Sequence, residues 1–288
     1  MESTPQIRHQ SAIVPTLKGP ILAIILFEVC AIFIRSFAAM GLEESGLSPL
    51  VSKDLSWLLV PVVLGGLMVP ILTANWHALK YQFRLGLLTV RLVLISIALG
   101  ATFRLAYWSW LFSNASFRHL SSPGPEEIAG PVFAFHCPST LALLLTIVVS
   151  VLLTPIVEEI INRGFFLQGL LHRGRWSAIA LSSILFGVFH VPHMIGPAIV
   201  FGFFVSVQFL NARTLWATTI SHATFNAMAI LDRTCLQVMW NPAEMVVSVG
   251  SLSLTLLVVS LAITAKLANS RYYGVKPGRI SHPGYPTR

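Results

Sequence analysis

Three apolar segments in the second half of the chain contain polar side chains whose types could support hydrolysis. In order, these segments read TPIVEEIINRGFF, LFGVFHVPH and TISHATFNAM. They contain Glu158, Glu159 and Arg163, then Phe186 and His190, and finally His222 and Asn226. An ionisable group inside a membrane segment is costly unless it is paired or hydrated, so such residues are candidates for function. Carboxylate, imidazole and amide groups together can transfer protons and stabilise an oxyanion.

Helical spacing predicts different surroundings for the two glutamates. Glu159 and Arg163 are four residues apart, so they share one helix face and can form an ion pair. Glu158 is turned about 100° away from that face. One carboxylate is therefore neutralised, and the other is left free. His222 and Asn226 are also four residues apart, so an imidazole and an amide can point into one cavity.

The expected helical hairpin brings a carboxylate and an imidazole to the same depth. We expect its turn near Gly174, which is flanked by Arg173 and Arg175. Glu158 lies 16 residues before this glycine, and His190 lies 16 residues after it. At about 1.5 Å per residue, both are roughly 24 Å from the turn, so they can meet in an antiparallel helix pair.

Such a cavity could hydrolyse a peptide bond. A desolvated carboxylate can take a proton from water, with a histidine sharing or orienting that water. His222 and Asn226 could donate hydrogen bonds to the oxyanion of the tetrahedral intermediate, which is usually the largest single term in acyl transfer. The alternative for each residue is structural: a polar network at a helix end, a packing histidine, or hydrogen bonds that only join helices.

The composition predicts the elements that must position these residues. Of the 288 residues, 55% are apolar and 10% are charged, whereas a soluble domain carries about a quarter charged residues. Apolar stretches near the roughly 20 residues that cross a bilayer predict helices. We expect them near 20–40, 55–74, 86–112, 139–172, 176–192, 194–211, 214–232 and 244–266. The predicted fold is all-α, a polytopic transmembrane helical bundle of about eight spans, with a kink at Pro155.

The basic residues predict the orientation of this bundle. With the N-terminus in the cytoplasm, three of the 19 Lys and Arg residues fall outside and three lie within the spans, which leaves 13 inside. The three outside are Lys53, Arg118 and Arg233, and the three within spans are Arg35, Arg91 and Arg104. This asymmetry favours eight spans with both termini cytoplasmic. The net charge of +8 therefore reflects topology, and no basic stripe indicates nucleic-acid binding.

The domain prediction is a single transmembrane domain over 20–268, with its motif core at 150–230. A cytoplasmic segment, 1–19, precedes it, and a cytoplasmic tail, 269–288, rich in Gly, Pro, Tyr and Arg, is predicted to be disordered. The outer connection 113–138 contains SSPGPEE and is predicted to be irregular.

The three cysteines are scattered, without a CxxC pair, so neither a redox motif nor a cysteine-rich metal site is indicated. Cys30 is interpreted as a small buried hydrophobic residue. Cys137 and Cys235 both fall outside in this topology. A disulfide between them is compatible with the topology, and the sequence leaves their separation open.

The motifs E-E-x-x-x-R, F-x-x-x-H and H-x-x-x-N, in this order on successive helices, resemble those of the CPBP family of intramembrane proteases. That family includes CAAX prenyl endopeptidases of the Rce1 type, bacteriocin-processing and immunity proteins, and sorting-type proteases. The resemblance covers roughly residues 150–230, and the first three predicted helices carry no recognised motif. Each motif alone is weakly specific, whereas three in order within membrane helices are strongly specific.

This resemblance implies an intramembrane endopeptidase of the glutamic type. The implied roles are the base for Glu158, its partner for His190, oxyanion or substrate-carbonyl donors for His222 and Asn226, and a supporting ion pair for Glu159 and Arg163.

The family is described both as metal-dependent and as glutamate-dependent without metal. Glu158, His190 and His222 could hold zinc, with an open fourth position for catalysis. No HExxH motif is present, and the ligands would have to converge from three helices. We therefore expect no metal and no other cofactor.

Two classes of function remain open. The first is a peptidase in the bilayer that cleaves near the C-terminus of a membrane-associated protein or peptide, which carries a lipid or a C-terminal helix. The second is a non-catalytic membrane binding protein, immunity protein or transporter that uses the same pocket. A transporter would be expected to show broken helices in two repeated halves, which the sequence lacks, so the peptidase is favoured.

The predicted localisation is the cell membrane, meaning the inner membrane of a bacterium, or the endoplasmic reticulum membrane in a eukaryote. The sequence leaves open the substrate, whether a CAAX protein, a bacteriocin leader or a C-terminal sorting signal. It also leaves open the oligomeric state and the membrane face to which the site opens. The depth estimate points outward if the Gly174 turn lies at the membrane surface, and inward if the hairpin protrudes.

Overall fold

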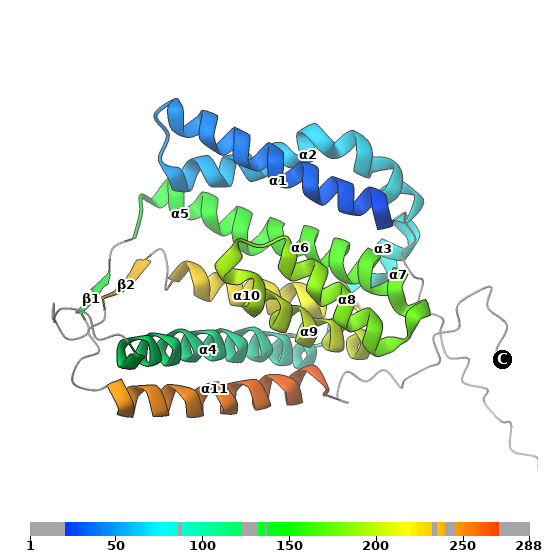
Figure 1. Ribbon diagram of the computed structural model, residues 1–288. Helices are drawn as coiled ribbons and strands as arrows, with labels where there is room; N and C mark the ends of the chain where they lie inside the picture. Colours follow the sequence, from blue (N-terminus) through cyan, green and yellow to red (C-terminus); the bar gives the residue numbers. More distant parts are fainter. Residues whose placement is uncertain are drawn as a thin grey trace, which may run out of the picture.

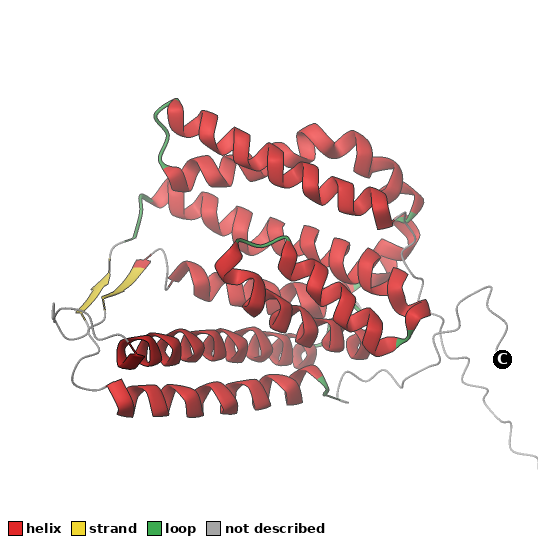
Figure 2. Cartoon of the chain, viewed as in Figure 1, coloured by secondary structure: helices red, strands yellow, loops and turns green. Residues whose placement is uncertain are grey.

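The architecture comes from a computed structural model that describes residues 21–85, 88–121, 132–135, 137–231, 235–239 and 246–270. The predicted N-terminal segment 1–19 and most of the predicted tail 269–288 lie outside the described residues. Helices dominate the described part of the chain, and a single pair of short strands accompanies them there (Figure 2).

The first half of the chain forms a hairpin of two long helices, then a short helix and a third long helix. Its elements are α1 (Ile21–Glu44), α2 (Pro49–Ala74), the short α3 (Trp76–Gln82) and α4 (Val90–Ser121). Helix α1 packs chiefly against α2. The predicted third segment, 86–112, was too short at its C-terminal end, because the mixed polar and aromatic residues up to Ser121 continue the helix.

A continuous helical rod spans Thr140–Arg173 and carries the two glutamates. It consists of α5 (Thr140–Thr146), η2 (Ile147–Leu153), α6 (Thr154–Glu159), η3 (Ile160–Leu167), α7 (Gln168–Leu170) and η4 (Leu171–Arg173). Both η2 and η3 are π-helical, a wider winding that often occurs at functional sites. Pro155, where a kink was expected, lies at the change from π-helical to α-helical turns, and it has no N–H to donate.

The remaining elements are α8 (Arg175–Val188), η5 (Pro192–Met194), α9 (Ile195–Ala212), α10 (Leu215–Ile230) and α11 (Val246–Ala268). The rod and α8 meet at Gly174, as predicted, and this residue has a φ of 95° that favours glycine. Helices α8 and α9 pack together, α10 lies against α4, and α4 packs along α11 (Figure 1).

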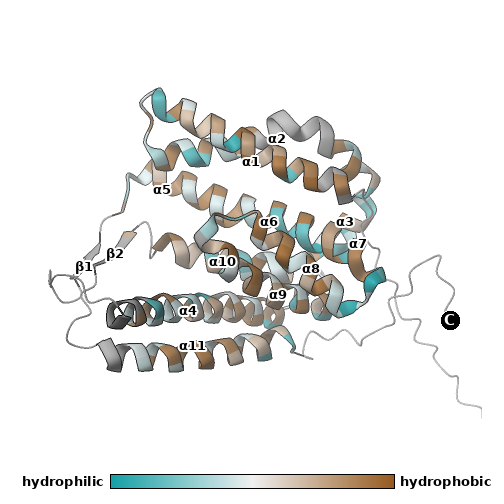
Figure 3. Cartoon of the chain, viewed as in Figure 1, coloured by the Kyte–Doolittle hydropathy of each residue, from teal (hydrophilic) through white to brown (hydrophobic). Residues whose placement is uncertain are grey.

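The bundle has two distinct ends. The Gly174 end, on the right of Figure 1, contains the start of α1, the turn between the rod and α8, and the end of α11. The strand end, on the left, contains the link between α1 and α2 and the strands β1 (Val132–Phe135) and β2 (Leu236–Met239). Figure 3 shows hydrophilic residues gathered at the turn between α7 and α8, within an otherwise largely apolar bundle.

The length and composition of the helices fit a multi-pass membrane protein. Among the described residues, five helical stretches are long and apolar enough to cross a bilayer: Ile25–Glu44, Val90–Asn114, Thr140–Arg173, Ile195–Ala212 and Gly250–Ala268. The predicted all-α polytopic bundle is confirmed. The count of eight spans stays a prediction, because α8 and α10, with 14 and 16 residues, are shorter than the usual span.

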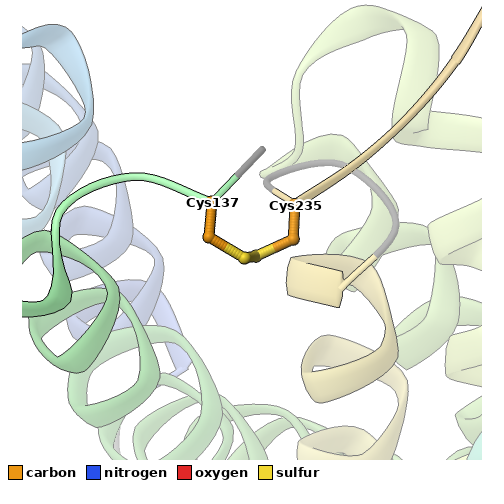
Figure 4. The surroundings of a disulfide bond; sticks show 2 residues. All are labelled: Cys137 and Cys235. Atoms are coloured by element: carbon orange, nitrogen blue, oxygen red, sulfur yellow. A yellow bond between two sulfur atoms is a disulfide. The ribbon is translucent and has the colours of Figure 1, made fainter. Parts of the chain in front are cut away.

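Two strands and a disulfide join the outer connections at the strand end. Strand β1 pairs antiparallel with β2, with Val132 opposite Met239 and Phe135 opposite Leu236. The connection 113–138, predicted to be irregular, therefore contains both the end of α4 and a strand. Cys137 and Cys235 form a disulfide beside these strands (Figure 4). It links Cys137, three residues before the rod, to Cys235, the residue just before β2, and so ties the outer ends of the rod and α10 together.

Close approach between α4 and α10 depends on a glycine. A Cβ atom at Gly100 would collide with the backbone carbonyl oxygen of Ser221 and crowd Thr224. The hydroxyl of Ser221 donates to the carbonyl of Ser96 at 2.9 Å, so the same contact is also a hydrogen bond between the helices. Small residues and interhelical hydrogen bonds of this kind are typical of helix packing in membranes.

Candidate functional site

A polar stripe runs along the rod at intervals of four residues. It comprises Thr146, Ser150, Thr154, Glu158 and Asn162, all of which line one cavity of about 380 Å³. Four-residue spacing places each of these side chains on nearly the same helix face as the one before it. Sequence reasoning singled out Glu158 alone among them, although the repeat of polar residues at this spacing was a readable signal.

The two neighbouring glutamates lie in different surroundings, as their spacing predicted. The Glu159 side chain is 0% exposed, and Arg163 Nη1 donates to its Oε1 at 2.9 Å. Arg163 Nη2 also donates to the carbonyl oxygen of Gly202 at 3.3 Å, and its guanidinium lies 4.6 Å from the ring centre of Phe186. The Glu158 side chain is 20% exposed and lines the cavity. The expected ion pair is therefore present, and Glu158 is the carboxylate open to the cavity.

His222 lies between the two carboxylates. Its Nδ1 is 3.0 Å from Glu159 Oε1, and its Nε2 is 3.8 Å from Glu158 Oε2. An ionised carboxylate only accepts hydrogen bonds, so Nδ1 carries a proton and donates it to Glu159. This bond fixes the ring so that Nε2 faces Glu158. The separation of 3.8 Å exceeds a hydrogen bond, so this second contact is electrostatic. Sequence spacing did not anticipate the contact between His222 and Glu159.

His190 is oriented by the end of α8, which it follows. Its Nδ1 is 2.8 Å from the carbonyl oxygen of Phe186, which can only accept, so Nδ1 is the protonated nitrogen. In the neutral ring Nε2 then carries the lone pair. His190 lines the same cavity as Glu158, as the matched depth predicted, and its ring centre lies 4.7 Å from that of Phe186.

Asn226 joins α10 to the rod and also faces the cavity. Its Nδ2 donates to the carbonyl oxygen of Ser150 at 2.7 Å. Ser150 lies in the π-helical segment η2, where the usual i to i+4 backbone pairing changes. A side-chain amide has two N–H donors, so one N–H of Asn226 can serve in the cavity while the other holds Ser150.

Helix α1 closes one side of the cavity with charged residues. Glu28 and Arg35 line the cavity, and Arg35 lies 5.0 Å from the ring centre of Trp57 on α2. Their interval of seven residues places both side chains on the same side of α1. Both Glu28 and Arg35 interact electrostatically with Glu158.

The arrangement of the titratable side chains also bears on metal binding. Within the described part of the chain, no group of three His, Cys, Asp or Glu residues is placed to hold a metal ion. Glu158, His190 and His222 share the cavity and do not form a ligand set in this arrangement. The expectation of a metal-free reaction stays a prediction for experiment.

The rod, the end of α8 and α10 thus place a carboxylate, two histidines and an amide around one cavity. Residues 140–228, from the first residue of α5 to the last turns of α10, match the family model described as type II CAAX prenyl endopeptidase Rce1-like. This segment is Rce1-like. The resemblance expected from the three motifs is confirmed here, and at the level of the family it supports a CAAX-type endopeptidase with a membrane-associated protein substrate. Comparisons with curated proteins and with solved structures gave no match.

The Rce1-like segment contains each catalytic and supporting residue named from the sequence. One wall of the cavity lies outside that segment, because its residues Glu28, Arg35 and Trp57 belong to α1 and α2. No motif marked these helices, so their contribution became visible only through packing. Their roles in function, and those of the residues in the segment, are proposals.

Proposed function

We propose that the protein is an intramembrane endopeptidase in which Glu158 activates water. The observation that carries this proposal is the position of Glu158 Oε2. This oxygen has no hydrogen-bond partner among the described residues, and it lies 3.8 Å from His222 Nε2 at the cavity. An unpartnered carboxylate oxygen in a polar cavity is suited to accept a proton from a bound water.

In the proposed reaction, water attacks the carbonyl carbon of the scissile peptide bond. The water proton passes to Glu158 as the new carbon–oxygen bond forms. His190 supports this step, because its Nε2 lone pair can accept the second hydrogen of the same water and fix its direction. When the carbon–nitrogen bond breaks, Glu158 returns its proton to the leaving amine. Both protons and bonds are thereby balanced without a further reactant.

The oxyanion requires donors, and two groups are positioned for this role. Asn226 has a second N–H beyond the one that holds Ser150. His222 can donate from Nε2 when it is protonated. Glu158, Glu159 and Arg163 together carry one net negative charge, so a proton on His222 brings the buried cluster to neutrality. In this arrangement Glu159 acts through His222, as a carboxylate that orients the imidazole.

The substrate in this proposal is a membrane-associated protein or peptide that is cut near its C-terminus. The protein resides in the cell membrane with both termini in the cytoplasm, so reporters fused to the two ends should both report the cytoplasmic side. The alternative, a non-catalytic membrane binding protein, immunity protein or transporter, would use the same cavity for binding. Replacing Glu158 separates the two, because binding does not require proton transfer.

The test is a comparison of purified wild type and Glu158→Gln in detergent, where both ends of the bundle are accessible. The probes are a library of internally quenched peptides together with a farnesylated CAAX peptide. Glu158→Gln preserves the shape of the side chain and cannot act as the base, so cleavage should fall by about 10²- to 10⁴-fold. Glu43→Gln is the matched control, because Glu43 is exposed at the end of α1.

Cleavage by Glu158→Gln at the wild-type rate would overturn the proposed mechanism. If wild type and Glu158→Gln bind a peptide equally and neither cleaves any probe, the non-catalytic alternative replaces the proposal. Equal thermal stability of the two proteins in detergent establishes that a loss of cleavage reflects chemistry rather than folding.

A further inference from the structure

The cavity extends from the catalytic groups toward only one end of the bundle. On α10 its lining residues run from His222 to Ile230, and on α8 they begin at Phe186. On the rod they run from Thr146 to Asn162. Apart from Asn162 and Phe186, which lie about one turn to the Gly174 side of Glu158 and His190, these residues lie between the level of Glu158 and the strand end, because the rod starts there and α8 and α10 finish toward it (Figure 1).

Buried side chains close the opposite direction. Every residue over 161–168, immediately beyond Glu158 and Glu159 on the rod, is buried. Arg163, Phe166 and Leu167 in this stretch are fully enclosed. None of the described residues on α10 before His222 lines the cavity. Among the described residues, the route from bulk solvent to Glu158 therefore comes from the strand end.

The mouth of the cavity lies among exposed residues of that end. Lys53, near the start of α2, is exposed at this end, whereas Val191, which follows α8 and lines the cavity at the level of His190, is 55% exposed. Leu50 and Ile230 complete this rim, and both are partly exposed. The charged side chain of Lys53 at the rim suits a water-accessible entrance.

The disulfide identifies the compartment at this end. Cys137 lies three residues before the start of the rod, and Cys235 follows α10 (Figure 4). Disulfides form and persist in oxidising compartments and are rare in the cytosol. The strand end therefore belongs on the non-cytoplasmic side of the membrane.

The distribution of cations leads independently to the same orientation. Exposed arginines gather at the Gly174 end, where Arg173 and Arg175 flank the turn, and Lys266 lies in the last turn of α11. Arg213 caps the C-terminus of α9 before the start of α10. Basic residues near span ends favour the cytoplasmic side. The Gly174 end is then cytoplasmic, and the strand end is not.

We propose that the substrate enters from the non-cytoplasmic side, through the mouth beside the Cys137–Cys235 disulfide. This inference rests on the proposed function and specifies its substrate class: a membrane-anchored protein whose scissile bond lies on the oxidising side of the membrane. A prenylated C-terminus in the cytoplasm does not reach this mouth. The disulfide holds together the outer ends of the rod and α10. These two elements carry Glu158 and His222, respectively.

The test is labelling of single introduced cysteines by a membrane-impermeant maleimide. The background carries Cys30→Ser, which removes the free thiol and leaves the disulfide intact. Val191→Cys probes the cavity at the level of His190, and Trp176→Cys is its matched control, because Trp176 is an apolar residue of α8, 62% exposed, at the Gly174 end. Lys53→Cys and Arg173→Cys form a second, charged pair with the same logic.

Intact cells should label Val191→Cys and Lys53→Cys, each gaining the mass of one reagent. Trp176→Cys and Arg173→Cys should be labelled only after the membrane is permeabilised. The reverse pattern, or labelling of all four positions from one side, would overturn the proposed route of entry.

A second measurement uses the unaltered chain, so it does not depend on any variant folding. Maleimide–polyethylene glycol added to denatured wild type should shift one thiol without reductant, at Cys30, and three after reduction. A chain that shows three free thiols when taken directly from cells would contradict the placement of the strand end in an oxidising compartment.

Labelling is independent of catalysis, so the two proposals fail separately. Repeating the experiment with Glu158→Gln should give the same labelling pattern. If wild type cleaves no probe but is labelled as expected, the proposed peptidase activity is wrong and the proposed route of entry stands. If wild type cleaves a probe but shows the reversed labelling pattern, the proposed peptidase activity stands and the proposed route of entry is wrong.

Discussion

Replacing Arg163 with alanine should destabilise the protein strongly, because it leaves Glu159 without its cationic partner. Arg163 is fully buried and donates to Glu159 at 2.9 Å and to the Gly202 carbonyl at 3.3 Å. Breaking a buried ion pair by removing one partner costs about 3–5 kcal/mol. The contact of Arg163 with the Phe186 ring contributes less, about 0.5–2 kcal/mol. The ion pair therefore dominates, and the folded-to-unfolded ratio should fall by roughly 10²- to 10⁴-fold.

The assay is unfolding of the purified protein in mixtures of mild detergent and dodecyl sulfate, followed by the fluorescence of its seven tryptophans. Arg173→Ala is the control on the same rod, because Arg173 is exposed and its loss should change the free energy of unfolding by less than about 0.5 kcal/mol. The double variant Glu159→Gln with Arg163→Met removes both charges. It should cost less than Arg163→Ala alone, since no buried charge is left unpaired.

Two results would refute this reasoning. Wild-type stability and wild-type abundance of Arg163→Ala would show that the pair does not support the fold. A double variant at least as unstable as Arg163→Ala would show that lost volume, rather than an unpaired charge, is the cause. Activity of Arg163→Ala should also fall, because Glu159 holds both Arg163 and His222 through the same oxygen.

Further outcomes are expected from the same geometry. His222→Ala and Asn226→Ala should each lower kcat by about 10²- to 10³-fold if they stabilise the oxyanion, measured by peptide cleavage; a change only in KM would exclude that role. Gly100→Ala should lower stability by about 1–3 kcal/mol, because the new methyl group meets the Ser221 carbonyl. Gly196→Ala, with nothing within 4 Å of the new Cβ atom, is its control in α9. Strong chelators should leave cleavage unchanged; loss of cleavage that zinc restores would reassign the acidic and histidine groups as metal ligands.

The helices could be predicted from the sequence to the extent that length and apolarity define them. Each of the eight expected segments has a helical counterpart, because about 20 apolar residues in lipid must satisfy their backbone hydrogen bonds internally. Helix α3 and the end of α4 were missed, since both are polar or aromatic and extend beyond an apolar stretch. The strands were missed because each has only four residues and pairs with a partner about one hundred positions away.

The site could be predicted where its geometry is local. The pair of Glu159 and Arg163 follows from helical spacing alone, and the structure contains it. The contact of His222 with Glu159 joins residues 63 positions apart, so it depends on how α10 packs against the rod. The contribution of α1 is of the same kind, since Glu28 becomes a cavity residue only after α1 and α2 fold over the rod.

The two π-helical segments of the rod determine which residues share a face. In an α-helix, four residues advance about 400°, so a stripe at four-residue intervals winds by about 40° at each step. From Thr146 to Asn162 this drift would reach about 160°, nearly the opposite side of the helix. In η2 and η3 a turn needs more residues, so four residues fall short of a full turn and the drift reverses.

The two π-helical segments therefore keep the five polar residues of the stripe on one face of the rod. Each wide turn amounts to one residue absorbed without breaking the helix. Deleting one residue such as Val151 would offset the tightening of η2 to an α-helix, whereas a chain in which η2 tightened with every residue kept would have Glu158 rotated by about 100° relative to Thr146. Such a chain would keep every side chain of the site and lose the common face on which they meet.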